Sequence, residues 1–120
     1  MEELCRRHEV VPVCPEQLGG LPTPRTPAER QGGRVVTKTG GDVTEQYLRG
    51  AAEAVRLAQL LGCSVAVLKE RSPSCGSGAV YDGTFTGTLT DGFGTAAEAL
   101  RTAGIRVLGE SQLAAFLAEN

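Results

Sequence analysis

The spacing of apolar residues in the middle of the chain predicts a long helix. From residue 43 to residue 61 they recur at intervals of three or four, as on one face of an amphipathic helix. These residues are Val43, Tyr47, Ala51, Ala54, Val55, Ala58 and Leu61. Asp42, followed three residues later by Glu45, resembles a capping box at its start, and Gly62 is typical of a helix end.

Two segments predict strands, and the first of them is an uninterrupted apolar run after its serine. They are "SVAVL" at residues 64–68 and "IRVLG" at residues 105–109. Strands that are buried on both faces of a parallel sheet show such runs, whereas half-exposed strands alternate apolar and polar residues. We therefore expect both runs in one parallel sheet.

Helices are predicted between and after these strands. Thr95 and Glu98 have the spacing of a capping box for a helix through Arg101, and "ESQLAAFLAEN" predicts a closing helix. The alternation of strands and helices predicts an α/β fold with a small, mostly parallel sheet and flanking helices, in a Rossmann-like three-layer arrangement.

The first third of the chain has a different character. "HEVVPV", residues 8–13, is a short apolar run that predicts a strand ending at Cys14. Residues 14–33 contain four of the six prolines and four glycines, which predicts irregular structure. "RVVTKTGGDV", residues 34–43, predicts a small hairpin that turns at Gly40 and Gly41.

Composition narrows the class of protein. The 120 residues, of which 41% are hydrophobic, suit one domain spanning residues 1–120. A net charge of -2 without a Lys/Arg block argues against binding to nucleic acid or an acidic membrane. No apolar run approaches the roughly 20 residues that cross a bilayer, and the charged start lacks a signal segment, so a cytoplasmic location is expected.

The loop "KERSPSCGSG", residues 69–78, follows the first predicted strand and is the candidate ligand site. Ligands of open α/β sheets bind beyond the carboxyl ends of the strands. Cys14 and Cys75 each follow a predicted parallel strand, so we expect them to face one another across one crevice. The alternative is that both are small buried residues, as cysteines without a disulfide usually are.

Several long stretches carry a resemblance to a known family. They are "VCPEQLGGLPTPRTPAE", "GGRVVTKTGGDVTEQYLRGA", "LKERSPSCGSGAVYDGTFTGTLTDGFGTAAEALR" and "GIRVLGE", which together cover most of residues 9–110. In these stretches the chain resembles a bacterial family long described only as a domain of unknown function, whose characterised members are iron-sulfur thiouracil desulfidases. The resemblance implies desulfuration of a thiolated pyrimidine such as thiouracil.

The resemblance also implies a 4Fe-4S cluster with Cys14 and Cys75 as two of its ligands. Thiolates suit iron-sulfur clusters, and three cysteines leave one iron open to take the sulfur of the substrate. The family pattern begins with a further strand and a cysteine that have no counterpart in these 120 residues. The cluster is therefore expected to be complete only if a third ligand is supplied, and Cys5 is a poor candidate because it precedes the predicted strand.

Two of the other site residues follow from the same resemblance. Glu16 and Ser72 match residues expected to move protons or to position the thiocarbonyl group and water. Arg25, Ser74 and Gly76 are candidates for contacts with the substrate, which is expected to be a thiolated base or nucleoside. An alternative without a part in catalysis stays open for each. Glu16 could be an exposed acid, the Ser72 hydroxyl could cap the turn, and Arg25 could only stabilise its loop.

Two further interpretations stay open. The glycines of the loop could expose backbone N–H groups, which would make the protein a non-catalytic module that binds an anion or a nucleotide. The chain could also be an inactive form that folds or pairs with another chain. A sheet without the family's first strand would leave an apolar edge uncovered, which favours a homodimer.

Overall fold

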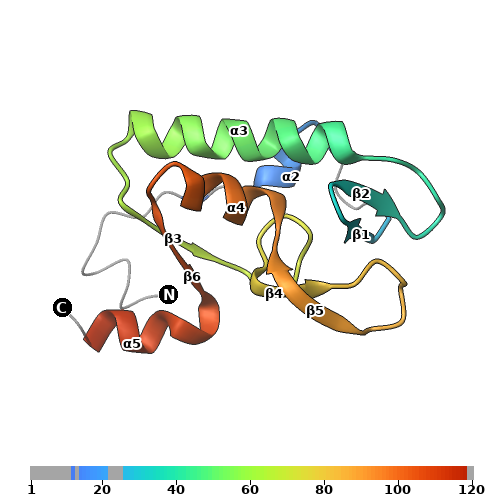
Figure 1. Ribbon diagram of the computed structural model, residues 1–120. Helices are drawn as coiled ribbons and strands as arrows, with labels where there is room; N and C mark the ends of the chain where they lie inside the picture. The colour runs from blue at the N-terminus through green and yellow to red at the C-terminus, as the bar shows by residue number, and fades with distance from the viewer. Residues whose placement is uncertain (1–11, 13, 22–25, 119–120) are drawn as a thin grey trace.

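The computed structural model describes residue 12, residues 14–21 and residues 26–118 (Figure 1). The helices and strands follow one another in the order α2 (Pro15–Leu18), β1 (Ala28–Gln31), β2 (Arg34–Thr37), α3 (Thr44–Leu60), β3 (Val65–Leu68), β4 (Ser77–Tyr81), β5 (Leu89–Phe93), α4 (Thr95–Thr102), β6 (Arg106–Gly109), the 3-10 helix η1 (Glu110–Gln112) and α5 (Leu113–Ala118).

The two predicted buried strands, β3 and β6, pair in parallel. Val65 lies opposite Arg106, and Leu68 lies opposite Gly109. The chain returns from β3 to β6 through the β4–β5 hairpin and then through α4, which supplies the expected helix between the two parallel strands. The predicted α/β class with parallel strands is thus confirmed, although the described residues also form two antiparallel hairpins, β1–β2 and β4–β5.

The core lies where α3 and α4 pack side by side against the β3–β6 pair (Figure 1). Its buried centre comprises Leu68, Ala97, Leu100 and Ile105. Half-buried side chains pack around this centre, Cys75 among them. The loop that carries Cys75 is therefore attached directly to the core.

The segment predicted to be irregular contains two short elements, so that prediction was wrong in part. Pro15 occupies the first turn of α2, where a missing N–H costs no hydrogen bond. The strand β1 begins at Ala28, directly after Pro27, and so avoids the prolines. The density of prolines predicted irregular structure, but it did not show where α2 and β1 form.

The hairpins also differ from the prediction. The β1–β2 hairpin turns at Gly32 and Gly33, while the predicted turn at Gly40 is a small extension closed by one bridge between Val36 and Asp42. The β4–β5 hairpin was not predicted, because glycine and threonine interrupt its apolar alternation.

The predicted helix boundaries were nearly right, but the predicted amino-terminal caps were wrong. The helix α3 begins at Thr44, where Asp42 Oδ1 accepts the N–H of Thr44 at 2.9 Å. The end is as expected, with Gly62 at φ +68° directly after the C-cap. In α4, Thr95 is the first helical residue and not the cap.

Asp42 provides a test of this α3 boundary. Hydrogen bonds from Thr44 and Arg34 lower the pKa of Asp42 from 3.8 to about 2. A lowered folded-state pKa means stability that is present above about pH 4 and is lost as the pH falls toward 2. We expect Asp42→Asn to flatten the fall of the unfolding midpoint between pH 4 and pH 2; equal slopes in urea titrations of both proteins would contradict this role.

Other predictions fall partly outside the described residues. The expected strand at residues 8–13 lies there except for Pro12, and so does Cys5. No helix in the described part has the length and apolar character needed to cross a membrane. The single-domain and homodimer predictions stay predictions.

Candidate functional site

The turn at residues 72–76, between β3 and β4, is held by its own hydrogen bonds. The Oγ of Ser72 accepts the N–H of Cys75 at 2.7 Å, and the carbonyl oxygen of Ser72 accepts the N–H of Gly76 at 2.9 Å. Ser72 thus caps the turn, which is the role expected as the alternative to catalysis. Its hydroxyl proton is not used in that bond, so a second role as a donor is compatible with the geometry.

The amino end of α4 holds the same turn from outside. The N–H of Thr95 donates to the carbonyl oxygen of Pro73 at 2.8 Å, and the N–H groups of Ala96 and Ala97 donate to that of Ser74 at 2.9 and 3.1 Å. These backbone carbonyls take the place of a side-chain cap. Because the first N–H groups of α4 are used in this way, the helix terminus positions the turn and is not open to an anion.

Gly94 allows α4 to approach the turn closely, and Gly76 allows the turn to fold back on itself and on β4. A Cβ at Gly94 would overlap the carbonyl group of Ser74 and lie 2.6 Å from the nitrogen of Cys75. A Cβ at Gly76 would lie 2.8 Å from the carbonyl oxygen of Ser72. Gly76 is therefore required by close contact, whereas Gly78, at φ +106°, is required by its backbone conformation.

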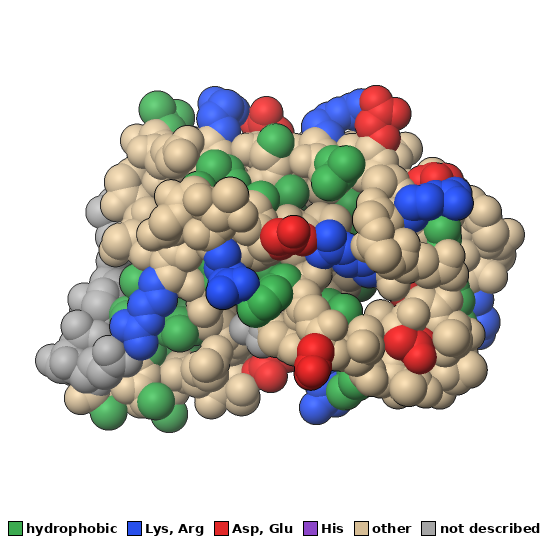
Figure 2. All heavy atoms as spheres, in the orientation of Figure 1, with side chains coloured by type: hydrophobic (Ala, Val, Ile, Leu, Met, Phe, Trp, Pro, Cys, Tyr) green, Lys and Arg blue, Asp and Glu red, His purple; other side chains and the backbone are tan. Residues whose placement is uncertain are grey.

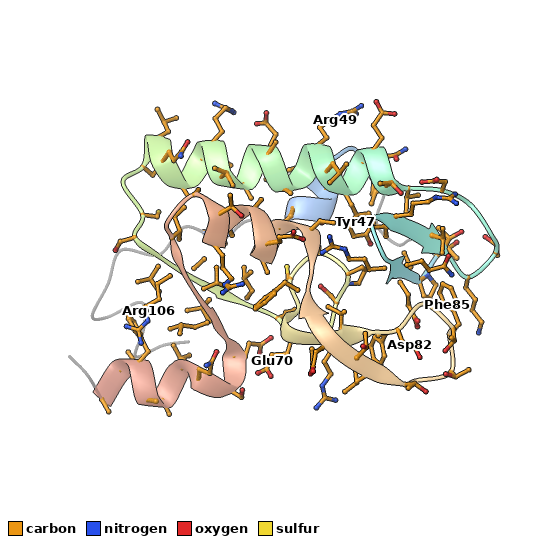
Figure 3. The ribbon with its side chains drawn as sticks, in the orientation of Figure 1. Tyr47, Arg49, Glu70, Asp82, Phe85 and Arg106 are labelled. Atoms are coloured by element: carbon orange, nitrogen blue, oxygen red, sulfur yellow. The ribbon has the colours of Figure 1, made fainter. Side chains whose placement is uncertain are left out.

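The approach to the turn contains a second fixed point, Glu70. Its Oε1 accepts the N–H of Ser111 at 2.6 Å, and hydrogen bonding by Ser111 lowers the pKa of this carboxyl group. A Cβ at Gly109 would lie 2.8 Å from Cγ of Glu70. Figure 3 shows Glu70 where the ends of β3 and β6 meet η1. Nothing in the sequence distinguishes Glu70 from other loop acids, so this link was missed.

Backbone strain marks the residue that follows Glu70. Arg71 has φ +73°, a conformation that is unfavourable for a side chain with a Cβ, and it forms a bridge to Val80. Such strain persists only where the surroundings fix the backbone. The turn with Cys75 therefore starts from a constrained position.

Cys14 is placed by a different pair of elements. It is the N-cap residue of α2, and its carbonyl oxygen accepts the N–H of Leu18 at 3.0 Å. The helix α2 lies directly against α3, because a Cβ at Gly19 would overlap the carbonyl oxygen of Gln46 and a Cβ at Gly50 would overlap that of Pro15. The position of Cys14 thus depends on glycine contacts between α2 and α3.

The structure brings part of the predicted site together. Ser72, Ser74, Cys75 and Gly76 lie in one turn, and Cys75 is half-buried, as is Cys14. Glu16 belongs to α2, two residues after Cys14, but its side chain is not among those described. Arg25 lies outside the described residues. The approach of Cys14 to Cys75 stays a prediction.

The described residues contain no group of three or more His, Cys, Asp or Glu side chains that could hold a metal ion. Cys63 is not placed to join Cys14 and Cys75 as a third ligand. It precedes the amino end of β3, whereas Cys75 follows the carboxyl end. The strand of four residues between these two ends is about 13 Å long. Any third thiolate would therefore come from outside the described part of the chain.

Two buried hydroxyl groups lie at the contact between the turn and α4. Ser74 is 1% exposed and Thr95 is 5% exposed. Neither Ser74 Oγ nor Thr95 Oγ1 has a hydrogen-bond partner among the described residues. A sequence cannot reveal an unpartnered hydroxyl, because residue type alone does not show burial.

Charge does not concentrate on the viewed face of the molecule. Figure 2 shows basic and acidic side chains interspersed over it, without a large patch of one sign. Ion pairs such as Arg30 with Glu98, at 2.7 Å, and Arg34 with Asp42, at 2.7 Å, join opposite charges among the described residues. The viewed face therefore offers no large patch of one charge.

Comparisons with known proteins agree with one another. Residues 1–112 match the family model described as 2-thiouracil desulfurase. The uncharacterized protein YbbK of Bacillus subtilis (strain 168) is 44% identical over 123 residues, covering 94% of this chain and 82% of that protein. The solved structure of the [4Fe-4S]-dependent thiouracil desulfidase TudS has a TM-score of 0.91 and 47% identity, covering 99% of this chain and 81% of that one.

Proposed function

This chain belongs to the 2-thiouracil desulfurase family, and we propose that it removes sulfur from a thiolated pyrimidine such as thiouracil. The observation that carries the proposal is the match of 47% identity and TM-score 0.91 to a [4Fe-4S]-dependent thiouracil desulfidase. The substrate is a small-molecule thiolated base.

The donor chemistry of the described residues fits a 4Fe-4S cluster in kind. Cys14 and Cys75 are half-buried thiolate sources, each fixed by a short rigid element. Soft sulfur ligands are those that iron-sulfur clusters take. We propose these two as ligands, with a third thiolate from outside the described residues. When bound, the cluster supplies a soft iron that accepts the sulfur of the thiocarbonyl group.

The reaction is a hydrolysis in its balance. The carbon–sulfur double bond is replaced by a carbon–oxygen double bond, water supplies the oxygen, and sulfide leaves, with no net change of oxidation state. Water must lose protons and the departing sulfur must gain negative charge or protons. A positioned acid–base group therefore accelerates the reaction.

Glu16 and Ser72 are the proposed groups for these steps. Glu16 follows Cys14 by two residues, at the amino end of α2, and its carboxylate is proposed to take a proton from water. Ser72 Oγ already accepts the N–H of Cys75, so its own proton is available to donate to the substrate. Arg25 and Gly76 remain proposed substrate contacts, Gly76 through its small size.

The anion-binding alternative has less support. The N–H groups of Cys75 and Gly76 donate to Ser72, and the first N–H groups of α4 donate to Pro73 and Ser74. The backbone donors that would cradle an anion at this turn are therefore already used.

The proposal predicts sulfide release by the reconstituted protein. Once a third cluster thiolate is supplied, and after anaerobic loading with iron and sulfide, it should release sulfide from 2-thiouracil or 4-thiouracil and form uracil. Glu16→Gln should keep the visible absorbance of the cluster and slow release by about 100-fold or more, since general acid–base catalysis contributes at least that much. The matched control is Glu45→Gln, an exposed acid on α3. A loaded protein that releases no sulfide from either compound would refute the function.

A further inference from the structure

The two unpartnered hydroxyls beside Cys75 require an explanation. A buried polar group without a partner destabilises the folded state, so proteins rarely retain one without a reason. Among the described residues, Ser74 Oγ and Thr95 Oγ1 are the two buried side-chain oxygen or nitrogen atoms in this state. Both lie at the contact between the turn and the first residue of α4.

The surroundings leave Ser74 little freedom to find a partner by moving. Its carbonyl oxygen accepts two N–H groups from α4, and the next N–H, that of Cys75, donates to Ser72. The backbone of Gly94 lies so close that a Cβ there would overlap the Ser74 carbonyl. The backbone of Ser74 is thus fixed on both sides, while its hydroxyl remains unused.

We propose that the hydroxyl of Ser74, which has no partner among the described residues of the cluster-free protein, donates a hydrogen bond to the thiolate sulfur of Cys75 when this cysteine binds the iron-sulfur group. This inference rests on the proposed function, and it reassigns Ser74 from substrate contact to a positioning role. The thiolate of Cys75 would supply the missing partner. Hydrogen bonds to sulfur raise the reduction potential of such clusters, so Ser74 would also tune the site.

Ser74 is favoured over Thr95 because it directly precedes Cys75 in the tight turn. Thr95 is 20 residues further along the chain, at the base of the turn, where its backbone N–H already supports Pro73. Thr95→Val is therefore the matched control: it removes an unpartnered buried hydroxyl from the same contact without touching the residue beside the ligand.

The test compares Ser74→Ala, Thr95→Val and the wild type, each as the full chain with and without the cluster. Without the cluster, both variants should unfold a few degrees higher, by about 4 °C, because each loses an unsatisfied polar group. With the cluster, only Ser74→Ala should have a more negative reduction potential, and it should lose its visible absorbance to a chelator about tenfold faster.

The outcomes separate this inference from the proposed function. A wild type that takes up no cluster even when a third thiolate is supplied overturns both. If the loaded wild type and Ser74→Ala have the same reduction potential and lose the cluster at the same rate, the role of Ser74 is overturned and the proposed function is not. Equal changes in Ser74→Ala and Thr95→Val, or a lower unfolding temperature of cluster-free Ser74→Ala, would also overturn it, because the effect would then be one of packing.

Discussion

Cys14→Ser and Cys75→Ser are each expected to abolish the brown absorbance of the reconstituted protein and, with it, sulfide release. Serine keeps the size of the side chain but replaces a soft thiolate by a hydroxyl, which is a poor ligand for iron in a cluster. A site that depends on these two thiolates and one more cannot lose either of them and still hold a cubane. Bound iron should fall to below about a tenth of the wild-type value.

Cys63→Ser is the control, because it makes the same substitution at a cysteine that is not a proposed ligand. Cys63 is half-buried like the other two cysteines but precedes the opposite end of β3. This variant should keep the absorbance and the iron content of the wild type. Iron content and visible spectra measured side by side decide the matter, and unchanged values in both Cys14→Ser and Cys75→Ser would refute the ligand assignment.

Gly50→Ala is expected to be the most destabilising single-methyl change in α3. In an exposed helix interior, alanine is about 1 kcal/mol more favourable than glycine. Here a Cβ would overlap the carbonyl oxygen of Pro15, which is backbone and cannot rotate away. The cost of overpacking should exceed the gain in helix propensity, so we expect a net loss of about 2 kcal/mol in urea unfolding.

The same substitution should also weaken the site, because α2 carries Cys14 at its N-cap. Displacement of α2 from α3 would move that cysteine and lower iron uptake even where the protein stays folded. Gly33→Ala is the matched control, since a Cβ at Gly33 would have no heavy atom within 4 Å. A Gly50→Ala protein as stable as the wild type would show that α2 does not pack on Gly50.

Helix α3 and the pair β3–β6 could be predicted from the sequence because they are encoded locally. The apolar residues at helical spacing from Val43 to Leu61 fit an amphipathic helix, whatever else the chain does. The apolar runs around Val65 and Val107 could be buried on both faces only in a parallel pair. Gly62 was recognised as the end of α3 because glycine adopts positive φ at little cost.

The caps of α4 could not be predicted, because they come from another part of the chain. Thr95 and Glu98 have the spacing of a capping box, yet the groups that satisfy the helix are the carbonyl oxygens of Pro73 and Ser74, about 20 residues earlier. Every residue has such a carbonyl, so residue type carries no signal of this use. Gly94, which permits the contact, looks like an ordinary loop glycine in the sequence.

For the site, the sequence by itself determined the chemistry: which side chains are present, that Cys75 follows a buried strand, and that its loop is made of small residues. The tertiary structure decided how that loop is held, with Ser72 capping the Cys75 turn, α4 supporting it, and Ser74 buried without a partner. The physical reason is that donor type and spacing are local properties, whereas burial and backbone partners are set by residues distant in the chain.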